Sequence, residues 1–163
     1  MDTKSQITEQ EHQQFIMASL NERDKINQFK KLNPDFDLKK VTNVSGYSTF
    51  DAYAVSGESL YNWAVEVKIR SFGIKKYSTA YIKCYKWYQM ISKCDTPEYK
   101  EKNVQPYYMM FYTDGSVALW NLYHAPADFI IKEYTLYNVI NSPVVKNKLF
   151  ELKLSDATIY KWK

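Results

Sequence analysis

The sequence is short of the residues that build zinc sites, catalytic triads and disulfide frameworks. Its 163 residues include only two cysteines, Cys84 and Cys94, and two histidines, His12 and His124. The cysteines form no C-x-x-C pair and no histidine has zinc-ligand spacing from them, so we expect reduced thiols in a cytoplasmic protein. The histidines are isolated, and they indicate neither a metal cluster nor a triad.

Long apolar runs are lacking too. No run of about 18 apolar residues occurs, and the polar start MDTKSQ is not followed by the apolar segment of a secretion signal. The chain has no internal repeat, linker or low-complexity tract. We therefore expect one soluble domain over residues 1–163 that is neither exported nor inserted into a membrane.

Acidic residues are missing from the middle of the chain. Seven basic residues and no Asp or Glu lie between Lys68 and Lys93, in a protein of net charge +4. The segment from about Tyr77 to Ser92 has helical spacing, which predicts a helix with a stripe formed by Lys76, Lys83, Lys86 and Lys93. Such a stripe is often a solvated face, but the absence of acids favours contact with phosphates.

What the sequence does contain is a strand with charges where apolar residues are expected. In YNWAVEVKIR (61–70), Val65, Val67 and Ile69 alternate along one face, which predicts a strand. Glu66 and Lys68 share the opposite face. Charges inside a sheet are costly unless they are paired or bind a ligand, so this pair indicates a site.

The preceding segment supplies a second acid. YSTFDAYAV (47–55) predicts a strand that forms an antiparallel hairpin with 61–70. A turn between Glu58 and Ser59 places Asp51 directly opposite Glu66. A turn set differently by one residue pair makes Asp51 a diagonal neighbour, still on the same face. Either way, two carboxylates and Lys68 share one patch.

The other predicted elements flank this hairpin. A capping box at Thr8–Glu11 starts a helix that runs to about Phe29. The remaining expectations are a strand in DLKKVTNV (37–44), a polar loop over 95–103, a hairpin around Asp114-Gly115, a short helix over 127–139, a break at 141–143 and a strand over 149–154.

The shared patch has the chemistry needed to cleave a phosphodiester. The oxygens of Asp51 and Glu66 are hard ligands that can hold Mg²⁺ and leave coordination positions for water and a phosphate oxygen. Lys68 can orient that water or stabilise the negative charge of the transition state.

These residues resemble the core motif of the PD-(D/E)XK nuclease superfamily. Asp51, a hairpin, and then Glu66-Val67-Lys68 match the motif, although Phe50 replaces its proline. EVKIR with Tyr77, Lys86 and the TDGSVALWNL hairpin resembles small phage and bacterial members. The resemblance implies an α/β fold with a restriction-endonuclease-like mixed sheet core (α-β-β-β-α-β) flanked by helices over about 8–122. An extra C-terminal hairpin and a tail over 123–163 complete the expected fold.

The resemblance also implies roles for individual residues. Asp51 and Glu66 become ligands of Mg²⁺ or Mn²⁺, Lys68 the catalytic lysine, and Glu11, or alternatively Glu9, an acid on the first helix. The residues expected to contact nucleic acid are Arg70, Lys76, Tyr77, Lys83 and Lys86. The implied activity is metal-dependent hydrolysis of nucleic acid, with DNA favoured over RNA. Many such nucleases pair to cut two strands, so a homodimer and a monomer both stay open.

Several alternatives remain. Glu66 and Lys68 could be an ion pair on a solvated sheet face, and the capping box gives Glu11 a structural role. A chain with this fold could bind nucleic acid without cleaving it, or serve as a protein-interaction module. The tyrosines of the basic segment, Tyr77, Tyr81, Tyr85 and Tyr88, are expected to pack rather than to stack on bases.

Overall fold

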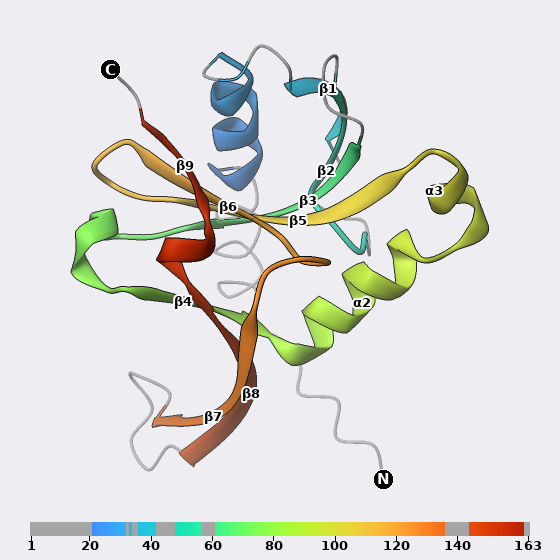
Figure 1. Cartoon of the computed structure of the whole chain (residues 1–163). Coiled ribbons are helices and arrows are strands. Elements are labelled where there is room, and N and C mark those ends of the chain that lie inside the picture. The colour runs from blue at the N-terminus through green and yellow to red at the C-terminus, as the bar shows by residue number, and fades with distance from the viewer. Residues whose placement is uncertain are drawn as a thin grey trace, which may run out of the picture.

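The computed structural model contains two β-sheets and helices packed against them (Figure 1). It describes residues 21–31, 33, 36–41, 48–56, 61–135 and 144–161. An N-terminal helix occupies 21–31. Glu11 and Glu9, the capping box and the break at 141–143 lie outside the described residues. No helix in the described part of the chain is long and apolar enough to span a membrane.

The larger sheet has six strands in the order β1-β2-β3-β5-β6-β9. Only β3 and β5 are parallel, and the other neighbours are antiparallel. The parallel pair is central, which requires the chain to cross from one end of the sheet to the other between these two strands. The strands are β1 (Phe36–Val41), β2 (Ala52–Ser56), β3 (Asn62–Ile69), β5 (Val104–Phe111), β6 (Ser116–Asn121) and β9 (Thr158–Lys161).

The predicted hairpin of β2 and β3 is confirmed, and its register is the one expected. Ala52 pairs with Val65, and Ala54 pairs with Trp63. Directly before β2, the amide of Asp51 donates to the carbonyl of Val65 at 2.8 Å. Asp51 therefore lies beside β3, next to the pair of Ala52 with Val65, while the turn that joins the strands is outside the described residues.

The two faces of the larger sheet bury different cores. On one face, Val65 and Val67 pack with Ile26 and Phe29 of the N-terminal helix. On the other, Ala64 packs with residues of the crossover and of the smaller sheet. Since side chains alternate along a strand, Glu66 and Lys68 belong to this second face. Figure 1 shows the N-terminal helix and α2 (Cys84–Cys94) on opposite sides of the sheet.

The predicted helix over 77–92 is wrong in its first half. Residues Ile74–Lys76 form a 3-10 turn, Thr79–Lys83 form β4, and the helix α2 begins only at Cys84. β4 alternates as a strand should, with Ala80 and Ile82 buried, and it pairs with β8. Pairing of β-branched and aromatic residues with a distant strand therefore prevails over the local helical spacing. Consequently, the four lysines of the expected stripe do not lie on one helix.

The C-terminal part differs most from expectation. The expected helix over 127–139 is wrong over residues 127–135, since the β-branched and aromatic residues there form β7 (Ala127–Thr135), and residues 136–139 lie outside the described residues. β7 pairs with β8 (Val144–Lys153), which is longer than the expected strand. β4, β8 and β7 form the smaller sheet in the order β4-β8-β7, and the chain then returns through a 3-10 turn (Leu154–Asp156) to β9.

The sequence also makes predictions for two loops, at 95–103 and at Asp114-Gly115. The expected polar loop at 95–103 contains a short helix, α3 (Pro97–Glu101), whose first residue is the proline. The hairpin at Asp114-Gly115 is confirmed, and Gly115 has a φ of 78°, which glycine adopts without steric cost. The Asp114 carboxylate accepts hydrogen bonds from the amides of Ile74 and Ser116, which fixes the hairpin against the crossover.

Candidate active site

The centre of the candidate site is the carboxylate of Glu66, on β3 between β2 and β5. Glu66 and Ser116 are the buried polar residues among those that the structure describes, and Glu66 is the charged one. Lys68 Nζ lies 3.4 Å from its Oε1, and Lys86 Nζ lies 2.9 Å from its Oε2. Two lysines thus offset the buried negative charge, as burial of a carboxylate requires.

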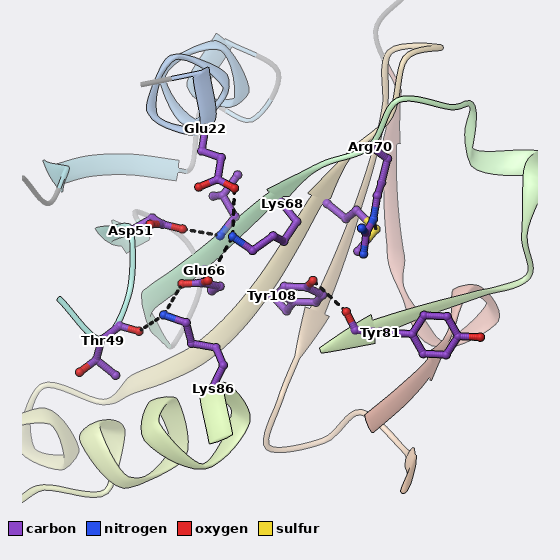
Figure 2. Close-up of polar contacts among 11 residues, drawn as sticks. Glu22, Thr49, Asp51, Glu66, Lys68, Arg70, Tyr81, Lys86 and Tyr108 are labelled. Atoms are coloured by element: carbon purple, nitrogen blue, oxygen red, sulfur yellow. Dashed lines mark hydrogen bonds and ion pairs between the residues drawn. The ribbon is translucent and has the colours of Figure 1, made fainter. Parts of the chain in front are cut away.

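Lys86 reaches Glu66 from α2, on the crossover between β3 and β5. Its Nζ also donates to the carbonyl of Thr49 at 3.0 Å, so one ammonium group links the helix, the strand and the segment before β2 (Figure 2). The contact with Glu66 Oε2 is a short charged contact, and it opposes the rise in the pKa of Glu66 that burial causes.

Lys68 is held by a second acid, Glu22 of the N-terminal helix. Its Nζ donates to Glu22 Oε1 at 3.0 Å, and Figure 2 shows Glu22 extending from the helix toward Lys68. Lys68 therefore lies between two carboxylates. This arrangement fixes the position of its charged end although the side chain is partly exposed.

Asp51 completes the cluster from the partner strand. Its Oδ2 accepts a hydrogen bond of 2.8 Å from the amide of Val67, and this bond orients the carboxylate at the edge of β3. The same acid acts electrostatically on Glu66, Lys68 and Glu22. Three carboxylates and two ammonium groups are therefore gathered in one place.

The charges of the cluster shift one another's pKa. Burial raises the pKa of Glu66 to about 7, Asp51 raises it as well, and the two lysines oppose this shift. Burial acts to lower the pKa of Lys68, but the negative charges of Glu66 and Glu22 outweigh it and the net pKa is raised. Burial raises the pKa of Glu22, against the effect of Lys68. Glu66 thus titrates near neutrality, while Lys68 stays a cation.

The donor set fits a hard divalent cation with few protein ligands. Among the described residues, no group of three His, Cys, Asp or Glu side chains is arranged to hold a metal ion. Asp51 and Glu66 supply two carboxylates, which interact electrostatically with each other. Mg²⁺ is commonly held by one or two carboxylates, with water and substrate phosphates as its other ligands. The residues present meet this smaller requirement.

Other predicted residues lie beside the cluster or away from it. Arg70, two residues beyond Lys68, directs its Nε to the sulfur of Met110 at 3.2 Å. Lys76, on the 3-10 turn, lies over the rings of Phe72 before the turn and of Tyr77 directly after it. Lys83 ends β4. Of the basic residues expected to contact nucleic acid, Lys86 is the one that pairs with an acid of the cluster in the described part of the chain.

Glu22 is the site residue that the sequence analysis missed. Glu22, Ile26 and Phe29 recur at steps of four and three, so they share one helical face. Ile26 and Phe29 are fully buried on that face. The signal for Glu22 in the sequence was therefore an acidic residue on the same helical face as an apolar stripe. The capping box directed attention to Glu11 and Glu9 instead, and their positions are not among the described residues.

The order of the strands and helices around this cluster agrees with the order that the sequence predicts. An antiparallel β1-β2-β3 meander, a helical crossover and a parallel β5, with two acids and a lysine at the hairpin, form the restriction-endonuclease-like plan that the sequence predicts. Neither a family model nor a curated protein sequence matches the chain.

One solved structure similar to the chain is the Holliday junction resolvase Hjc of Archaeoglobus fulgidus. The two share 15% identity over 85% of each chain, with a TM-score of 0.49. A likeness of this degree determines neither activity nor substrate, which depend on the site itself.

Proposed function

We propose that the protein is a metal-dependent nuclease that hydrolyses phosphodiester bonds, with DNA favoured over RNA. The observation that carries the proposal is the buried Glu66 between two lysines, with Asp51 beside it on the partner strand. Burying an acid at this cost is expected at functional sites, where charged groups of shifted pKa gather.

In this proposal Asp51 and Glu66 hold Mg²⁺ or Mn²⁺. When bound, the cation supplies an activated water and offsets the charge that develops on the phosphate. Lys68 places a fixed positive charge beside the scissile phosphate and stabilises the extra negative charge of the transition state. Glu22 positions Lys68 by accepting its hydrogen bond. Lys86 positions Glu66 by pairing with Oε2.

Glu66→Gln tests the proposal directly, because it keeps the shape of the side chain and removes its charge. Calorimetry should show Mg²⁺ or Mn²⁺ binding to the native protein, and the variant should lose it along with cleavage of labelled DNA. Glu133→Gln is the matched control, since Glu133 also pairs with a lysine but is exposed. A native protein that neither binds these metals nor cuts DNA would contradict the proposal.

A second candidate function is nucleic-acid binding without cleavage. It is favoured by the two lysines, whose ammonium groups offset the charge of Glu66. This candidate predicts salt-dependent DNA binding that is indifferent to Mg²⁺. A salt titration beside the cleavage assay separates the two functions.

A further inference from the structure

A groove runs along the outer face of α2, next to the candidate active site. Its volume is about 730 Å³. Tyr85, Tyr88, Gln89 and Ser92 recur at steps of three and four, so they form one face of the helix. The residues lining the groove include Tyr85, Tyr88, Gln89, Lys93, Ser48 and Thr49.

The tyrosines of this groove are exposed, contrary to the expectation that they pack. Tyr85 and Tyr88 are 59% and 58% exposed. The rings of Tyr88 and Phe150 are in a T-shaped contact, at a centroid distance of 5.7 Å and an interplanar angle of 74°. This contact limits the orientation of Tyr88 while much of its ring stays accessible. Exposed aromatic rings beside a groove are platforms for flat ligands.

The charge around the groove favours an anionic ligand. α2 carries Lys86 and Lys93 and no acidic residue. Lys93 lines the groove, and Lys83 Nζ lies 5.8 Å from the centre of the Tyr85 ring. Aromatic rings interleaved with lysines bind single-stranded nucleic acid, in which bases stack on the rings and phosphates contact the cations.

Thr49 connects the groove with the candidate active site. Thr49 lines the groove, and its carbonyl accepts the 3.0 Å hydrogen bond from Lys86 Nζ, which also pairs with Glu66. Figure 2 shows Thr49, Lys86 and Glu66 in this succession. The groove therefore lies next to the acid cluster.

We infer that the groove binds unpaired bases of the nucleic-acid substrate, stacked on Tyr85 and Tyr88. The faces of bases within a duplex are covered by their neighbours, so only unpaired bases can stack on these rings. The inference rests on the proposed nuclease function and narrows its substrate to nucleic acid with a single-stranded portion. The polar side chains of Gln89 and Ser92 would contact base edges and sugars.

The test measures binding by fluorescence anisotropy in EDTA, which prevents cleavage. The probes are a labelled single-stranded oligothymidylate and a labelled blunt duplex of equal length. Tyr85→Ala and Tyr88→Ala should each weaken binding of the single strand at least about fivefold, with a smaller effect on the duplex. Tyr85→Phe and Tyr88→Phe keep the rings and should bind within about twofold of the native protein.

Ile159→Ala is the control, because Ile159 is also an exposed apolar residue but lies on β9. It should leave both affinities unchanged, and circular dichroism establishes that each variant is folded. Equal losses for single strand and duplex, or no loss at all, would overturn the inference. So would Phe variants as weak as the Ala variants.

The inference and the proposed function fail in different ways. If the native protein cleaves DNA with Mg²⁺ while the tyrosine variants bind the single strand normally, the groove assignment is wrong and the nuclease stands. If the tyrosine variants lose single-strand binding but the native protein never cleaves, the nuclease is wrong and the groove stands. A native protein that binds neither probe overturns the groove assignment, and the cleavage assay with Mg²⁺ decides the nuclease separately.

Discussion

Two ion pairs of nearly equal length lie in opposite parts of the molecule. Lys86 and Glu66 approach to 2.9 Å between α2 and β3, with side chains 20% and 5% exposed. Lys146 and Glu133 approach to 3.0 Å across β7 and β8, with side chains 69% and 55% exposed. An exposed pair contributes little to stability, whereas a buried acid depends on its partners. Burial, rather than distance, separates a candidate site from a surface pair.

Substitutions in the buried cluster and at the exposed ion pair should differ most in their effect on activity. Lys68→Ala removes the fixed cation beside Glu66 and should reduce metal-dependent cleavage on the order of 100-fold or more. Lys146→Ala removes an exposed lysine and should leave the rate unchanged. Initial rates on a labelled DNA substrate give both values. Equal rates for the two variants would remove Lys68 from the proposed mechanism.

Substitution of the buried Glu66 and of the exposed Glu133 should also differ in how it changes the dependence of stability on pH. The pKa of Glu66 is raised from its ordinary value of 4.5 to about 7 in the fold. The stability due to its protonated form is fully present below about 4.5 and is lost as the pH rises through 7. Between pH 5 and 8, the native protein should therefore lose on the order of 2 kcal/mol of unfolding free energy relative to Glu66→Gln.

Urea unfolding in the absence of metal, at several pH values, measures this difference. Glu133→Gln provides the exposed counterpart, for which the same comparison should stay under about 0.5 kcal/mol. A constant difference between the native protein and Glu66→Gln across this range would show that Glu66 does not titrate there.

The smallest of these effects concerns the lysine partners themselves. Lys86→Ala leaves Glu66 with less compensation and also removes the donor to Thr49. At pH 8 it should cost about 1–2 kcal/mol of unfolding free energy, since uptake of a proton by Glu66 limits the loss. Lys146→Ala should cost less than about 0.5 kcal/mol. Urea midpoints give both, and a double-mutant cycle of Lys86→Ala with Glu66→Gln isolates the pair.

Much of the larger sheet could be predicted because its signals are local. Alternation in 61–70 and the short link to 47–55 predict the antiparallel pairing of β2 with β3, and the observed register of these strands is one of the two that the sequence left open. The Asp114-Gly115 hairpin was equally readable, since glycine at a positive φ marks the turn. Charges on a strand of otherwise apolar character indicated the candidate site.

The missed elements depend on contacts between distant segments. Residues 79–83 have helical spacing with α2, and only pairing with β8 makes them a strand. β7 likewise forms by pairing with β8. Glu22 has no motif of its own, and its contact with Lys68 spans 46 positions of the chain. Pairing between such distant segments depends on the topology of the whole fold. The periodicity of a single segment carries no information about it.

The last strands have a consequence for the order in which the protein is made. β8 pairs with β4, and β9 closes the edge of the larger sheet next to β6. Both partners are synthesised well before β8 and β9 leave the ribosome. Since α2 directly follows β4, we expect Lys86 to reach its final position only once β8 has been made. A nascent chain without β8 would then carry Glu66 without its full set of partners, so the candidate site would assemble only after β8 has left the ribosome.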